Sequence, residues 1–154
     1  MKKQFLLFST VFIASFSLLS SCQKDDNLPV IKTKTQLLTQ KTWKFSSATL
    51  GGTDMTASVP ACQKDNVTSF ITGGTGSGNE GATKCNVTDP QTVSFTWSFQ
   101  SGETMLTTSS PLIPGTTTGS STSTIVSLTE TELKLSQPVT IGPTTQTAVA
   151  TFVH

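Results

Sequence analysis

The sequence predicts an all-β fold, an antiparallel up-and-down β-barrel of about eight strands with a short N-terminal helical turn. In the segment 92–100, Val93, Phe95, Trp97 and Phe99 alternate with polar residues at the two-residue period of a strand. Charged residues make up only 12% of the chain; Thr and Ser supply the polarity, and Thr favours strands. Finally, short strand-like segments follow one another with tight links, and such a chain can hide its sheet edges by joining its first strand to its last.

Residues 1–21 have the features of a secretory signal peptide. Lys2 and Lys3 precede a mostly apolar run that is too short to span a hydrocarbon layer of ~30 Å comfortably. The run ends in Leu19-Ser20-Ser21-Cys22, which resembles the lipobox of bacterial lipoproteins. That resemblance implies cleavage before Cys22, acylation of its sulfur (with palmitate as the expected acyl group) and a lipid anchor. An uncleaved anchor with an incidental Cys22 is the alternative.

Residues 22–34 are expected to form a flexible tether, because they contain little to bury. Within them, Lys24-Asp25-Asp26 resembles the surface-export signal of Bacteroidota lipoproteins, and a solvated linker is the alternative. The exported protein is therefore expected in the outer membrane, on the cell surface or the periplasmic face. The remaining residues, 35–154, have the length of one domain with a single modest core.

Charge and cysteine usage narrow the function classes. The ten basic residues are all lysines, face nine acids and form no basic stripe, which argues against a nucleic-acid partner. With Cys22 used for lipid, Cys62 and Cys85 are expected to pair in an oxidising compartment, adding roughly 3 kcal/mol of stability. A reactive thiol or metal pair is the alternative, but the only histidine is His154, so we expect no metal site.

The first elements follow from residue patterns. Residues 35–40 can form one or two helical turns with Thr35 as N-cap. Residues 42–50 alternate as a half-buried strand, with Trp43, Phe45, Ser47 and Thr49 on one face. The further expected elements are a turn at 51–54, an irregular segment at 55–62, and strands at 66–72, 80–84, 92–100, 104–108, 124–128, 133–136 and 146–153.

Glycine, proline and polar residues mark the expected loops. The run GGTGSG at 73–78 is expected to be a flexible connection; no helix pattern and no lysine follow it as a phosphate loop would need. A turn is expected at 86–90. Residues 109–121 are rich in Pro, Gly and Thr and are expected to form a long surface loop, too polar and broken to pack. Residues 138–145 are expected to form another loop.

With this strand series in place, the chain resembles the lipocalin-like domain of secreted Bacteroidota lipoproteins. The resemblance covers about residues 36–153, and Lys41 stands where the Gly-x-Trp of true lipocalins has its glycine. It implies a β-barrel whose ligands are mostly undefined in the family. The segments that carry the resemblance are 37–44, 60–66, 80–85, 89–91, 95–98, 125–129 and 133–135.

A barrel of this size encloses either packed side chains or one small ligand. We expect a lipid-anchored binding module for a small apolar or amphipathic ligand, monomeric and without a cofactor. The alternative is a filled, non-enzymatic barrel that contacts a partner protein or glycan, or inhibits a protease, through the loops 73–78 and 109–121. The candidate interior residues are Trp43, Phe45, Phe70, Phe95, Trp97, Phe99, Leu106, Leu128, Leu133 and Phe152.

An enzyme is not expected. The sequence has no internal His, no Arg and no Tyr, and no free thiol if Cys62 and Cys85 are joined, so no nucleophile is paired with a base. A catalytic pair of carboxylates would have to come from the acids in the turns of the domain, and the spacing of these acids does not indicate such a pair. We expect these acids, Asp65, Glu80, Asp89 and Glu103, to be solvated.

Overall fold

The computed structural model describes residues 31–116 and 119–154. The expected signal peptide, the lipidation site Cys22 and most of the tether lie outside the described residues. Ile31–His154 forms one compact unit that contains the whole described core. No helix among the described residues is both long and apolar enough to cross a membrane.

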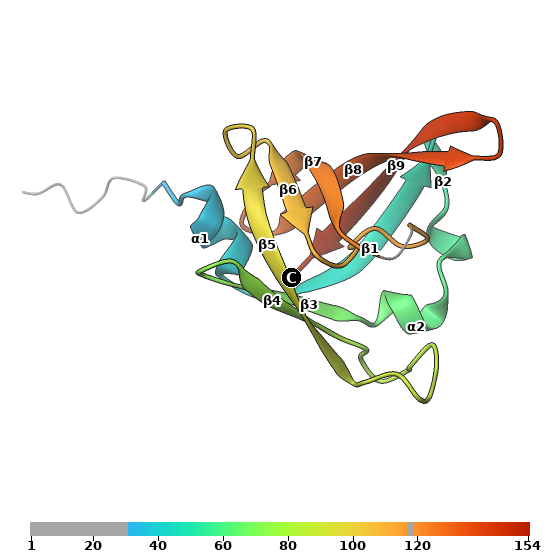
Figure 1. The fold of residues 1–154 in the computed structure, drawn as a ribbon, viewed down its shortest axis with the longest axis horizontal. Coiled ribbons are helices and arrows are strands. Elements are labelled where there is room, and N and C mark those ends of the chain that lie inside the picture. The colour runs from blue at the N-terminus through green and yellow to red at the C-terminus, as the bar shows by residue number, and fades with distance from the viewer. Residues whose placement is uncertain (1–30, 117–118) are drawn as a thin grey trace, which may run out of the picture. The chain divides into compact units, whose positions relative to one another are not determined.

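The all-β prediction is confirmed: eight antiparallel strands close into a barrel, accompanied by one two-residue strand and small helices (Figure 1). The helical elements are α1 (Lys34–Thr39), a 3-10 turn (Thr56–Ser58) and α2 (Ala61–Lys64). The strands are β1 (Trp43–Leu50), β2 (Thr53–Asp54), β3 (Val67–Ile71), β4 (Thr75–Asn79), β5 (Thr92–Gln100), β6 (Met105–Thr108), β7 (Ser121–Leu128), β8 (Glu132–Ile141) and β9 (Thr144–Val153).

The strands follow one another around the barrel in chain order, and β9 returns to pair with β1. This closing ladder runs from Lys44 opposite Val153 to Leu50 opposite Ala148. β2 pairs only with the end of β1 and lies outside the ring. Joining first strand to last removes the long free edges that would otherwise invite pairing with other chains.

The helical turn is confirmed, but its cap lies two residues earlier than predicted. Thr33 is the N-cap of α1: its hydroxyl accepts from the backbone N–H of Gln36, whose side chain accepts from the backbone N–H of Thr33. This reciprocal capping box satisfies two N–H groups that a helix leaves unpaired. Leu38 from α1 is fully buried, and its carbonyl accepts from the indole N–H of Trp43 at 2.9 Å.

The alternation predicted for β1 is right at its start and wrong after Phe45. A bulge between Phe45 and Ser47 inserts one extra residue opposite β9. A single extra residue exchanges the two faces of the strand beyond it. As a result Ala48 and Leu50 line the interior in place of Ser47 and Thr49, each opposite an inward alanine of β9.

The predicted flexible connection at 73–78 is wrong: only Gly73 and Gly74 turn, and Thr75–Asn79 is the strand β4. A Cβ on Gly76 would lie 2.5 Å from the Phe95 ring and 2.6 Å from the carbonyl of Ser69. Glycine is therefore the residue that lets β3 and β5 approach β4 so closely. The strand predicted at 80–84 is also wrong, because that segment forms turns, whereas the turn predicted at 86–90 is confirmed.

The loop predicted at 138–145 is wrong as well. β8 and β9 form one long hairpin that turns only at Gly142 and the residue after it. Pro138 pairs with Thr147 inside this ladder. A proline can occupy this position because the pairing of β7 with β8 ends at Ser136, so the other side of Pro138 requires no N–H.

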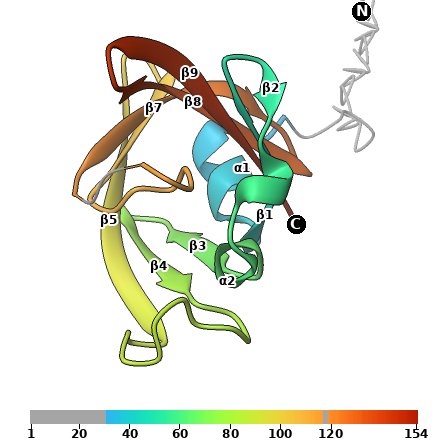
Figure 2. The ribbon, with the colours of Figure 1, turned by 90° about the vertical axis from the view of Figure 1, so that its right-hand side faces the viewer.

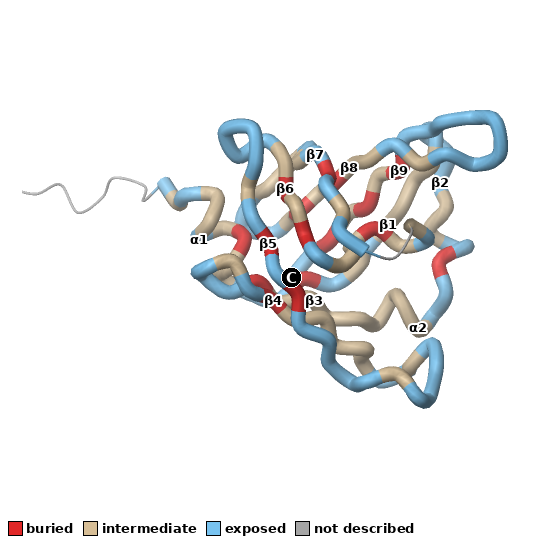
Figure 3. Tube along the Cα trace, viewed as in Figure 1, coloured by how far each residue is buried: buried red, intermediate tan, exposed pale blue. Residues whose placement is uncertain are grey.

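The two ends of the barrel differ. α1 closes one end, where Trp43 and Leu38 are fully buried. The segment 109–116 lies across the opposite end, which also carries α2 and which we call the mouth (Figure 2). Figure 3 shows buried residues along the strands and exposed residues at the hairpin tips.

Candidate functional site

The candidate interior residues do lie inside the barrel. Seven of the ten are buried, and the other three, Phe45, Phe99 and Leu128, are partly buried against the core. Aromatic rings pack edge to face, with centroids 5.5 Å apart for Phe70 and Phe95 and 5.4 Å apart for Trp97 and Phe99. The gap enclosed between rings near Trp43 leaves no room for a water molecule. The half of the barrel nearer α1 is therefore filled by its own side chains.

The predicted surface loop at 109–121 is wrong for its first half. Ile113 is only 4% exposed and belongs to the core, and Leu112 packs against the core from the same segment. Thr116 fixes this turn, donating to the Ile113 carbonyl from its hydroxyl at 2.7 Å and from its N–H at 3.3 Å. The segment 110–116 thus lies across the mouth and closes part of it. We call this segment the plug.

An apolar cavity of about 300 Å³ lies on one side of the plug. We call it the apolar chamber. None of the described residues that line it is charged. Its volume is at the lower end of the range of about 300–1,000 Å³ for sites of small organic ligands. The side chains that give it its character are Leu50, Met55, Val59, Ile113, Val139 and Ala148.

A second cavity of about 260 Å³, which we call the polar chamber, lies on the other side. Three of the predicted interior residues line it, namely Phe45, Phe95 and Phe152. Polar side chains of the loops complete its wall, namely Gln63, Asn66, Thr68, Glu80, Ser110 and Thr116. Gln63 and the plug residues 113–116 line both chambers and form the partition between them.

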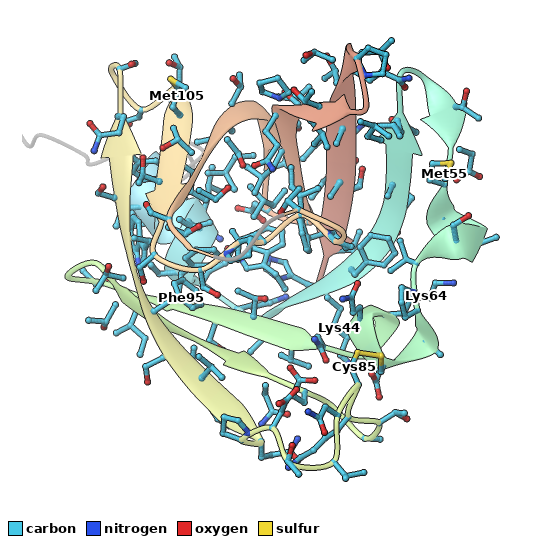
Figure 4. The ribbon with its side chains drawn as sticks, turned by 45° about the vertical axis from the view of Figure 1, so that its right-hand side comes forward. Lys44, Met55, Lys64, Cys85, Phe95 and Met105 are labelled. Atoms are coloured by element: carbon cyan, nitrogen blue, oxygen red, sulfur yellow. A yellow bond between two sulfur atoms is a disulfide. The ribbon has the colours of Figure 1, made fainter. Side chains whose placement is uncertain are left out.

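The predicted disulfide is confirmed: Cys62 on α2 is joined to Cys85, with their Cα atoms 5.1 Å apart. Figure 4 shows this bond beside α2, with Met55 on the same side of the barrel. The bridge holds the segment 80–91 against the segment 60–66. Together these two segments supply Gln63, Asn66 and Glu80 to the polar chamber.

Hydrogen bonds reinforce this bridge. Asp65 Oδ2 accepts from the backbone N–H groups of Ala82 and Thr83, both at 2.9 Å. The Asn66 amide, oriented with its nitrogen as donor, bonds the carbonyls of Glu80 and Cys62 at 3.0 and 2.9 Å. The expectation that Asp65 is a solvated turn acid is wrong, because its Oδ1 atom is buried without a partner among the described residues.

One carboxylate lines the chambers at the mouth. Glu80 is the only charged residue that lines either chamber, and within residues 31–116 and 119–154 its side chain makes no ion pair. Asp54 is the residue before Met55 of the apolar chamber, but it lines neither chamber itself. Hydrogen bonds from the hydroxyl and the backbone N–H of Thr56 hold the pKa of Asp54 below its usual value. The described part of the chain contains no cluster of three or more metal-ligating side chains.

Comparison with known proteins gives no further guidance: neither the scan of family models nor the search of curated proteins finds a match to the chain. The class that the fold and site define is a closed eight-stranded β-barrel with a plugged, partly apolar mouth.

Reasoning from the sequence missed the residues of the apolar chamber. Met55 and Val59 fall in a segment with no strand or helix period, and Val139 falls in a predicted loop. One signal was available for the plug: Pro111-Leu112-Ile113-Pro114 is an apolar run inside an otherwise polar stretch. An apolar run in a loop indicates a segment that packs.

Proposed function

We propose that this chain is an exported, lipid-anchored, lipocalin-like barrel that binds a small apolar or amphipathic molecule at its mouth. The observation that carries the proposal is the apolar chamber, a cavity with apolar walls and no charged lining residue. Burial of apolar ligand surface there would provide the driving force, at about 25 cal/mol per Å² removed from water.

The binding experiment uses the unit Ile31–His154, which contains the whole described core. N-phenyl-1-naphthylamine, an uncharged probe that fluoresces in apolar surroundings, is titrated into it. Val139→Phe fills the apolar chamber with a ring and is expected to weaken binding at least tenfold. The matched control is Val126→Phe on β7, where the valine is 56% exposed. Absence of probe binding, or equal binding by both variants, contradicts the proposal.

The anchor is proposed from the leader and from the lipobox-like residues before Cys22. Metabolic labelling with an alkyne analogue of palmitate is expected to mark the full chain and not its Cys22→Ser variant. The variant is also expected to leave the membrane fraction. Protease treatment of intact cells then distinguishes display on the cell surface from display on the periplasmic face. A labelled Cys22→Ser variant would refute the anchor.

A second candidate function is supported by the filled interior near α1 and by the plug. In it, the barrel is a solid, non-enzymatic scaffold that contacts a partner protein or a glycan, or inhibits a protease. The loops 73–78 and 109–121, which the sequence suggested for such contacts, are less suited to this role. Thr75–Asn79 is a barrel strand, and Ile113 is buried. The probe experiment separates the two, since a scaffold of this kind takes up no probe at the mouth.

A non-enzymatic role is part of both candidates. His154 lies at the α1 end, where its ring packs on Trp43 with centroids 3.9 Å apart, and it lines neither chamber. Cys62 and Cys85 are consumed by their disulfide. The mouth therefore offers binding surface without a nucleophile held beside a base.

A further inference from the structure

The two chambers differ in a way that bears on the head group of the ligand. Among residues 31–116 and 119–154, no charged residue lines the apolar chamber, and Glu80 alone lines the polar chamber. Three lysines belong to the elements around the mouth, Lys44 on β1, Lys64 on α2 and Lys84 in the segment 80–91, and none of them lines either chamber. The Lys84 ammonium donates to the carbonyl of Asp89 at 2.7 Å. Among the described residues, the charged side chain that lines the chambers is therefore that of Glu80, and it makes no ion pair.

Glu80 is placed there by the strand before it. Gly76 and Gly78 of β4 lie opposite Phe95 and Val93 on the inward face, and Glu80 continues the same alternation at the rim. Its carbonyl is held by the Asn66 amide, which also bonds the carbonyl of Cys62, the residue before Gln63. Gln63 lines both chambers, so these hydrogen bonds tie the backbone of Glu80 to the segment that carries the partition residue, and Glu80 itself lines the polar chamber.

The lack of a cation has a chemical consequence. A fatty-acid carboxylate placed at this mouth would find no lysine on the walls and would face the like charge of Glu80, and like charges repel across a partly desolvated site. An ammonium group would find an opposite charge without a competing ion pair. An uncharged head would find the Gln63 and Asn66 amides and the hydroxyls of the polar chamber.

We propose that the ligand is a cationic amphiphile, whose single apolar chain enters the apolar chamber while its ammonium group crosses the partition at Gln63 to lie beside the Glu80 carboxylate. This inference rests on the proposed function and adds the chemical class of the ligand. Glu80 is half-buried, so we expect its carboxylate to attract the ammonium group about as strongly as the partners of a partly exposed ion pair attract each other.

The test compares three ligands with one twelve-carbon chain: dodecyltrimethylammonium, 1-dodecanol and dodecanoate. Each displaces N-phenyl-1-naphthylamine from the unit Ile31–His154 below its critical micelle concentration. We expect the ammonium to bind about tenfold more tightly than the carboxylate at low salt, with the alcohol between them. The difference should shrink in 1 M NaCl, where charges are screened over about 3 Å.

Two variants assign the effect to one residue. Glu80→Gln is expected to bring the ammonium and the carboxylate to within about twofold while the neutral probe still binds. Glu103→Gln, in the turn between β5 and β6 at the α1 end, makes the same change in net charge and should keep the tenfold difference. Equal binding of the two ions by the wild type, or a preference that survives Glu80→Gln, overturns the inference while leaving the proposed function intact. A wild type that binds no neutral probe overturns both.

Discussion

The plug gives the most direct test of the structure, through the substitution Ile113→Ala. The change removes three side-chain carbons from a residue that is 4% exposed, worth about 2.4 kcal/mol at ~0.8 kcal/mol per buried methylene. A closed core would add a cavity term to this cost. Ile113 already borders both chambers, so little new enclosed volume is created and that term is small. We expect a loss of about 2 kcal/mol in the free energy of unfolding.

The assay is urea unfolding of Ile31–His154, followed by the fluorescence of the two tryptophans. With a slope near 2 kcal/mol per molar urea, the loss corresponds to a midpoint about 1 M lower. Ile141→Ala is the matched control, because Ile141 is 51% exposed at the tip of the long hairpin and should change stability by less than about 0.5 kcal/mol. If Ile113→Ala costs no more than this control, the segment 109–116 lies in solvent and the account of the plug is wrong.

Three further predictions use the same unfolding assay. Replacing Cys62 and Cys85 together by Ala should cost roughly 3 kcal/mol, because the bridge closes a loop with a separation of 23 residues, and reduction of the wild type should have the same effect. Gly76→Ala should cost more than about 2 kcal/mol, because its Cβ meets a phenylalanine ring on β5 and a backbone carbonyl on β3; Gly78→Ala, with open space at its Cβ, should cost no more than about 1 kcal/mol. Asp54→Ala should lower the midpoint at pH 7. A lowered folded pKa stabilises the fold above the unfolded pKa and ceases to do so as the pH falls through the folded pKa. The difference between variant and wild type should therefore shrink as the pH is lowered, and a constant difference would contradict the assigned hydrogen bonds.

The sequence predicted those parts of the fold in which side chains carry a clear period. β5 was predicted with its observed bounds, because four apolar residues alternate along it. β4 could not be found in this way, since its inward positions at 76 and 78 are glycines and show no hydrophobic pattern. The need for glycine at 76 depends on the Phe95 ring, which comes nineteen residues later in the chain. The sequence of residues 73–78 alone does not reveal that contact.

The phase error in β1 has a similar origin. Trp43 and Phe45 were placed on the correct face, but the bulge after Phe45 depends on the pairing with β9, about a hundred residues away in sequence. The hairpin of β8 and β9 was cut short because Pro138 usually ends a strand; here it lies beyond the reach of β7.

The candidate site was harder to foresee than the fold. The aromatic residues of the polar chamber, Phe45, Phe95 and Phe152, were predicted to face the interior, because they lie in segments recognised as strands. The apolar chamber arises where side chains from the 55–60 segment, the plug and the β8–β9 hairpin leave space unfilled. Unfilled space is a property of three-dimensional packing, and no pattern along the chain encodes it.

The position of α1 opposite the mouth has a consequence for how a tethered molecule would work. The described residues begin at Ile31, beside α1, at the end of the barrel opposite the mouth (Figure 1). Under the proposed function, a ligand would thus enter the barrel at one end, and the chain would lead away from the opposite end toward its N-terminal segment.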